Sequence, residues 1–151
     1  MADGSVPSIR GAPLRVVELH PAKRWGALVG LALSCPHDLT TVGAWAREAG
    51  ICETQLRLRC RLAGVPAKVS LDFTRVLRAA LYREACGGLL SDYLDVGDDR
   101  TMRHLFEKAG RVGREYGSVM EYVSAQPVIR EMSLIDELKK MLALSPILRS
   151  R

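Results

Sequence analysis

The sequence has few aromatic residues and no long hydrophobic run, and both shortages narrow the choice of fold. Its 151 residues include only two Phe, two Trp and four Tyr. The core must therefore consist mainly of Leu, Val and Ala, a composition that suits packed helices better than a β-sandwich. The apolar run Trp25 to Leu33 is too short to span a bilayer and indicates a buried helix. Without a membrane-length run or a signal peptide, we expect a cytoplasmic protein with reduced thiols.

The sequence also lacks the patterns that metal sites and enzymes usually carry. None of the four cysteines, Cys35, Cys52, Cys60 and Cys86, forms a Cys-x-x-Cys pair, and the three histidines stand at no metal-ligand spacing to them. Zinc is therefore not expected, and no other cofactor is indicated. A nucleophile–base pair, a Gly-rich phosphate loop and a carboxylate pair at catalytic spacing are all missing from the sequence, which argues against an enzyme.

Positive charge is concentrated in the middle of the chain. The net charge is +5, and residues 53–83 hold seven Lys and Arg against only Glu53 and Asp72. A local excess of this size is typical of a surface that binds a polyanion. On charge alone, a solvated basic face is the better explanation, so a DNA-binding hypothesis depends on the helical pattern.

Apolar residues at helical spacing, together with start and stop signals, predict helices along most of the chain. The predicted helices cover residues 21–34, 42–49, 52–63, 69–84, 89–94, 99–109, 115–125 and 133–144. Pro21 suits the first turn of the first helix, and Thr40 or Thr41 can cap the second. Gly50 is expected to end the second helix, because glycine adopts the left-handed conformation without a Cβ penalty.

The predicted helices 99–109 and 133–144 each begin at a residue that can act as an N-cap. Asp98 or Asp99 is the expected N-cap of helix 99–109. Ser133, with Asp136 three residues later, resembles the capped start of the final helix.

These helices predict an all-α fold in three parts. Residues 1–20 form a disordered or arm-like lead, residues 21–114 form the main domain, and residues 115–151 form a helical extension. The extension carries an amphipathic face made by Ile135, Leu138, Met141 and Leu142. We expect this face to close the core; the alternative is that it meets a partner protein or a second copy of the chain.

Two parts of the main domain look alike. Residues 41–61 and residues 91–106 each contain a polar start, a short helical pattern, a Gly-containing turn and a helix that bears Arg. This order is typical of a helix-turn-helix. We therefore predict two helix-turn-helix subdomains that are joined by the long linker helix 69–84, with extra flanking helices.

In this order of elements, the chain resembles the DNA-binding domain of AraC-type transcriptional regulators over about residues 39–110. The matching positions are Leu39-Thr40, Ala46-Arg47-Glu48-Ala49-Gly50, Leu56, Gly64-Val65, Arg75 with Ala79, and Leu105-Phe106 to Gly110. Cys60 stands where the family usually has Phe, and Val96-Gly97-Asp98-Asp99 replaces its usual turn, so the chain resembles a divergent, stand-alone bacterial member. The 38 residues before this region and the 41 after it are too few for the family's usual ligand-binding domain, so no small-molecule effector is expected.

The resemblance implies a sequence-specific transcription regulator that binds double-stranded DNA. In the family, the second helix of each motif enters the major groove, where Arg can bond guanine, Gln can bond adenine and an apolar group can touch thymine. On the first such helix, the residues offered to the groove are Thr54, Gln55, Arg57, Leu58 and Arg59. The expected phosphate contacts, which should lie on exposed faces, are Arg61, Lys68, Arg75 and Arg78. The second such helix offers Arg100, Thr101, Arg103 and His104.

The two motifs are not expected to contribute equally. Residues 84–114 carry five basic and six acidic residues, and Asp95, Asp98 and Asp99 crowd the second turn. We therefore expect helix 52–63 to supply most of the affinity. The acidic second turn also supports an alternative, in which the chain is a small helical adaptor for other proteins that keeps the fold without DNA readout.

Overall fold

The fold is all-helical in the part of the chain that the computed structural model describes, residues 20–109 and 118–145. These residues form seven α-helices and one 3-10 turn, with no strand. The elements in order are α2 (Pro21–Ser34), α3 (Val42–Ala49), α4 (Glu53–Leu62), α5 (Ala67–Cys86), η2 (Leu90–Tyr93), α6 (Asp99–Ala109), α7 (Val119–Ala125) and α8 (Met132–Ala143). The predicted N-terminal lead, except for His20, and the predicted helical start at 115–117 lie outside the described residues. None of the described helices combines the length and hydropathy that a membrane crossing needs.

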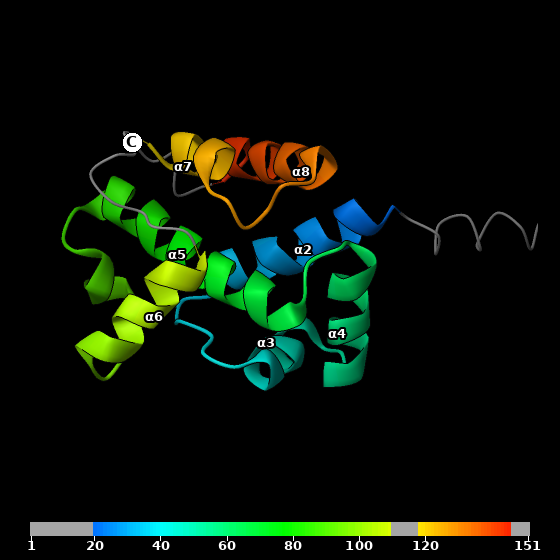
Figure 1. The fold of residues 1–151 in the computed structure, drawn as a ribbon, viewed down its shortest axis with the longest axis horizontal. Coiled ribbons are helices and arrows are strands. Elements are labelled where there is room, and N and C mark those ends of the chain that lie inside the picture. Colours follow the sequence, from blue (N-terminus) through cyan, green and yellow to red (C-terminus); the bar gives the residue numbers. More distant parts are fainter. Residues whose placement is uncertain (1–19, 110–117, 146–151) are drawn as a thin grey trace, which may run out of the picture.

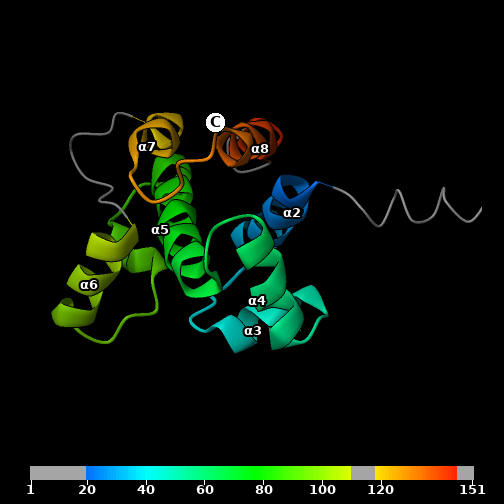
Figure 2. The same ribbon diagram turned by 45° about the vertical axis from the view of Figure 1, so that its right-hand side comes forward.

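The helices stack in three layers around α5 (Figures 1 and 2). Helices α2 and α5 lie in the middle layer and pack against each other. Helices α7 and α8 cover one side of this layer, and α3, α4 and α6 lie on the other side. Helix α5 contacts α2, α3, α4, η2, α6 and α7, so it is the common support of the fold.

The core is built around two fully buried tryptophans, Trp25 and Trp45. The Trp25 indole Nε1 donates a hydrogen bond to Ser70 Oγ at 2.9 Å, which joins α2 to α5. The Trp45 indole Nε1 donates to the Leu28 carbonyl at 3.0 Å, which joins α3 to α2. Both rings thus bury a large apolar area while their one polar group stays satisfied.

Local cap residues set several of the helix ends. The Thr41 hydroxyl accepts a hydrogen bond from the Ala44 N–H at 3.0 Å and caps α3. Gly50 ends α3 in the left-handed conformation, with φ of 72°, as predicted. The Asp98 carboxylate accepts a hydrogen bond from the Thr101 N–H at 2.7 Å at the start of α6.

Two of the sequence-based predictions about helix ends were wrong. Ser133 does not cap the last helix, because α8 begins one residue earlier, at Met132, with Glu131 as its N-cap. The predicted helix over 89–94 is only the short 3-10 turn η2, in which the Asp92 carboxylate accepts a hydrogen bond from the Leu89 N–H. This hydrogen bond between a side chain and the backbone stabilises the turn and competes with the backbone hydrogen bonds of an α-helix.

Helix α8 closes the core, as expected from its apolar face. Ile135, Leu138 and Leu142 are buried, and α8 packs along α2. The two helices approach closely at Gly30, where an added Cβ would lie 2.7 Å from the Met141 sulfur. The extension therefore belongs to the same packed unit as the main domain.

Candidate nucleic-acid interface

Helices α3 and α4 are joined by a three-residue turn, residues 50–52, that presents one side of α4 to solvent. The buried residues of this pair are Val42, Trp45 and Ala46 on α3 and Leu56 and Cys60 on α4. Because these side chains hold the inner face of α4 against the core, its opposite face is free for contact with another molecule.

The exposed side of α4 brings together most of the residues predicted to face the groove. Thr54, Gln55, Arg57 and Leu58 are exposed, and Arg59 is half-buried. Arg61, one turn further on, is exposed as well. Helix α4 carries three arginines against one acid, Glu53. The surface formed by residues 54, 55, 57, 58, 59 and 61 is called the α4 face below.

Two residues of the α4 face already have partners within the helix. Arg57 forms an ion pair with Glu53 at 2.8 Å, and both side chains are about half exposed to water. The Gln55 side-chain oxygen accepts a hydrogen bond from the Cys52 N–H at 3.2 Å, which helps to begin α4. An exposed ion pair of this kind is worth little, so Arg57 can exchange Glu53 for another anion at small cost.

Lys68 lies in the first turn of α5 and is well exposed. Its Nζ pairs with Asp72 at 3.0 Å, and the Asp72 side chain is only 4% exposed. The ammonium therefore neutralises a buried carboxylate while keeping most of its own surface in water.

Arg75 is not on an exposed face, and this corrects the prediction that it contacts phosphate. Its side chain is only 8% exposed and forms a bidentate ion pair with Asp38, the shortest contact being 2.8 Å. Its Nη2 also donates to the Asp95 carbonyl at 3.3 Å. The partners lie 37 and 20 residues away along the chain, so helical spacing on α5 could not reveal them.

Arg78 is buried as well, in this case among backbone carbonyls, so the expectation that it lies on an exposed face is also wrong. Its Nε donates to the Cys35 carbonyl at 3.0 Å and its Nη1 to the Tyr93 carbonyl at 3.2 Å. The guanidinium lies over the Tyr82 ring, 4.8 Å from its centroid.

The two arginines belong to one polar network between the halves of the fold. The Asp38 carboxylate, besides pairing with Arg75, accepts a hydrogen bond from the Asp95 N–H at 2.8 Å. We call the group formed by Asp38, Arg75, Arg78 and the backbone of Tyr93 and Asp95 the polar junction. It joins the segment after α2, the middle of α5 and the segment before α6.

The predicted residues of the second motif lie on the exposed side of α6. Arg100, Thr101, Arg103 and His104 are all exposed, while Leu105 is buried. The Thr101 backbone N–H and its hydroxyl both donate to the Asp98 carboxylate. These two hydrogen bonds hold the pKa of Asp98 below its ordinary value and keep a negative charge at the start of α6.

The exposed faces of α4 and α6 differ in charge. The two helices flank α5, and both lie in the layer away from α7 and α8 (Figures 1 and 2). Helix α6 carries Arg100, Arg103 and Lys108 but also Asp99 and Glu107. Its surface is therefore close to neutral, whereas the α4 face is clearly positive.

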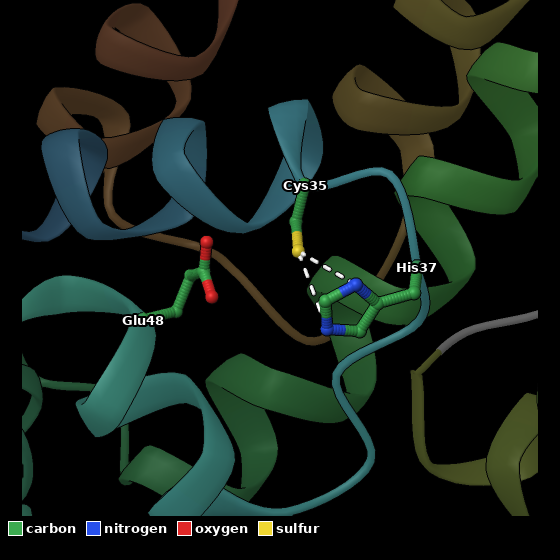
Figure 3. Close-up of side chains that lie close together, drawn as sticks. All are labelled: Cys35, His37 and Glu48. Atoms are coloured by element: carbon green, nitrogen blue, oxygen red, sulfur yellow. Dashed lines mark hydrogen bonds between the residues drawn. The ribbon is translucent and has the colours of Figure 1, made fainter.

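A third group of polar side chains, which the sequence did not predict, meets beside α3. The Cys35 Sγ lies 3.6 Å from Nδ1 and 3.7 Å from Nε2 of His37, and the Glu48 carboxylate points toward both (Figure 3). The three ligand atoms lie within 4.8 Å of one another. Cys35 and His37 are separated by a single residue, and Glu48 reaches them only through the packing of α3 against α2. No local spacing pattern could therefore have identified the group.

No protein-family model, no curated protein and no solved structure matches this chain. The resemblance to AraC-type DNA-binding domains therefore rests only on the shared residues between positions 39 and 110.

Proposed function

We propose that the chain is a sequence-specific DNA-binding transcription regulator with two helix-turn-helix motifs, α3–α4 and η2–α6, that α5 links. The observation that supports this most strongly is the α4 face. It carries three arginines, of which Arg57 and Arg61 are exposed and Arg59 is half-buried, and it follows a short turn at Gly50 after the well-packed helix α3. A basic helix presented in this way has the features of a recognition helix.

In this proposal, α4 enters the major groove of double-stranded DNA. Arg57 and Arg59 bond base edges, guanine being the preferred partner of an arginine fork, while Thr54 and Gln55 contact bases from the first turn. Arg61 and Lys68 bind the flanking phosphates. Lys68 can do so because a single salt bridge to Asp72 uses only part of its donor capacity.

The polar junction replaces the two phosphate contacts that the sequence suggested for α5. Arg75 and Arg78 are enclosed by their protein partners, so they act on DNA only by holding the two motifs in place. On α6, Arg100, Arg103 and His104 remain available, but the neighbouring acids weaken their attraction for phosphate. The α4 face therefore supplies most of the affinity.

The proposal predicts unequal effects of neutralising the two helices. Fluorescence anisotropy with a labelled mixed-sequence duplex, at several salt concentrations, measures the affinity and its salt dependence. We expect a dissociation constant on the order of 10⁻⁴–10⁻⁶ M that weakens steeply with salt. Arg57→Ala with Arg59→Ala should weaken binding far more than Arg100→Ala with Arg103→Ala.

A matched control tests whether net charge alone explains such a loss. Arg130 and Lys140 are exposed residues of the α7–α8 side, away from α4. Replacing both with Ala removes the same two charges and should leave the affinity nearly unchanged. Equal losses in all three double variants would contradict readout by α4, and no binding at low salt would contradict the proposal as a whole.

One observation favours a second candidate function, an adaptor that binds another protein through α4. Leu58 and Leu62 are large apolar side chains with exposed fractions of 47% and 56%. Exposed apolar groups beside arginines are common at the centres of protein interfaces. A Leu62→Ser variant separates the two functions, because Leu62 is exposed but lies outside the α4 face, so its loss should leave DNA affinity nearly unchanged and should strongly weaken a protein interface.

A further inference from the structure

We propose that Cys35, His37 and Glu48 form a binding site for a zinc ion. Cys35 is the C-terminal cap of α2, His37 lies in the segment that follows, and Glu48 lies in the last turn of α3 (Figure 3). The proposal is independent of DNA binding, because none of these residues belongs to the α4 face. It departs from the expectation, based on the spacing of the cysteines and histidines in the sequence, that the chain does not bind zinc.

The separation of the sulfur and nitrogen atoms agrees with a shared metal ion. Zinc binds cysteine sulfur at about 2.3 Å and histidine nitrogen at about 2.0–2.1 Å, so tetrahedral ligands lie roughly 3.5 Å apart. The Cys35 Sγ is 3.6 Å and 3.7 Å from the two His37 ring nitrogens. Because both nitrogens are almost equally close, a rotation of the exposed ring can aim either lone pair at the metal.

Glu48 completes a set of three protein ligands. Its carboxylate oxygen lies within 4.8 Å of the other two ligand atoms, and the side chain is exposed. The ion pairs found among the described residues do not include Glu48, so it can move inward without breaking a salt bridge. A thiolate, an imidazole and a carboxylate suit zinc, with water in the fourth position.

The backbone around Cys35 is held firmly, which favours a pre-formed site. The Cys35 N–H donates to the Ala32 carbonyl at 3.3 Å, and its own carbonyl accepts from Arg78 at 3.0 Å. The side chain is buried, with only 3% of the residue exposed. The backbone that carries the sulfur is thus anchored to α2 and α5, and the two exposed ligands can adjust to it.

The other thiols of the chain offer no comparable site. Cys52 and Cys86 are exposed, and burial raises the pKa of the Cys60 thiol and so favours its neutral form. Within residues 20–109 and 118–145, no other group of three or more His, Cys, Asp and Glu residues converges in this way. Metal binding to the described part of the folded chain should therefore depend on Cys35 alone among the cysteines.

Cobalt(II) provides a direct test, since it occupies zinc sites and shows a thiolate charge-transfer absorption. We expect the reduced full-length chain to bind one Co²⁺ with that absorption, and Zn²⁺ to displace it. Cys35→Ser should abolish the absorption, and His37→Ala and Glu48→Gln should each weaken binding about tenfold or more. Cys52→Ser and Cys86→Ser, the matched controls, should leave both the absorption and the affinity unchanged.

The test remains decisive even if Cys35→Ser, a substitution of a buried residue, disturbs folding. His37 and Glu48 are exposed, so their variants should keep the circular dichroism spectrum of the parent and test the ligands in a folded protein. Absence of saturable Co²⁺ binding, an absorption that survives Cys35→Ser, or one that is lost with Cys52→Ser would overturn the proposal. Unchanged affinity in both the His37 and Glu48 variants would overturn it as well.

Discussion

Arg75 and Asp38 are opposite charges that the fold removes almost completely from water. Their side chains are 8% and 4% exposed, and the carboxylate accepts both the guanidinium fork and the Asp95 N–H. Such a pair is stable only while each charge keeps its partner, because a lone buried charge is very costly. The energetic value of the pair therefore shows in what happens when one member is removed.

We expect Asp38→Asn to destabilise the protein by about 3–5 kcal/mol, because it leaves the Arg75 charge buried without a counter-charge. Urea denaturation followed by circular dichroism measures the change. Glu53→Gln is the matched control, since it breaks the exposed ion pair with Arg57 and should cost less than about 1 kcal/mol. Similar losses in the two variants would contradict the assignment of a buried, essential pair.

Asp98 gives a prediction about acid stability. Hydrogen bonds from Thr101 lower its pKa in the folded state, so ionised Asp98 stabilises the fold. This contribution is complete above the ordinary aspartate pKa of about 3.9 and is lost as the pH falls through the lower folded value. We expect the parent to be more stable than Asp98→Asn at neutral pH, and the difference to vanish in acid. If the difference in stability between the parent and Asp98→Asn stays constant from pH 6 to strong acid, the ionised form of Asp98 does not stabilise the fold.

At the scale of the helices, the ends that were predicted well are those set by neighbouring residues. Thr41 and Gly50 act through contacts within a few positions of themselves, so α3 could be located from sequence alone. The start of α8 was placed one residue late because no side chain caps it. There, the packing of Leu134 and Leu138 on the core, rather than a cap, decides where the helix begins.

The α4 face was largely predictable from the sequence, whereas the polar junction and the cluster of Cys35, His37 and Glu48 were not. Helical spacing shows which α4 residues point away from Leu56 and Cys60, and the structure agrees. The same reasoning failed for Arg75 and Arg78, because their partners come from distant segments. Polar partners of this kind depend on how helices pack, which a single sequence does not reveal.

The left-handed conformation of Gly50, in the turn between α3 and α4, can be tested by comparing alanine substitutions at two glycines. Gly50→Ala should destabilise the protein by about 1–2 kcal/mol, because the left-handed conformation is costly for a residue with a Cβ. Nothing lies within 4 Å of an added Cβ there, so the cost is conformational. Gly43→Ala, inside α3, should instead stabilise by about 0.4–1 kcal/mol. Thermal denaturation of both variants checks the opposite signs.

At the scale of the whole molecule, the apolar face of α8 can be tested as part of the core against the alternative that it is a partner interface. Leu138 is fully buried, so Leu138→Ala should cost about 2–5 kcal/mol of folding stability. Met132, 64% exposed on the same helix, should tolerate Ala with little change. If Leu138→Ala altered self-association measured by sedimentation and left stability intact, the face would be an interface instead.

The polar junction also has a consequence for cooperativity. One carboxylate, that of Asp38, accepts from Arg75 in the middle of α5 and from the backbone that leads into α6. Opening of the segment that holds Asp38 would leave the buried Arg75 charge without its counter-charge, and opening of the segment before α6 would take the Asp95 N–H and carbonyl away from the same pair. The two halves should therefore open together in native-state hydrogen exchange. A chain whose sequence predicts two similar motifs is thus expected to behave as a single foldon.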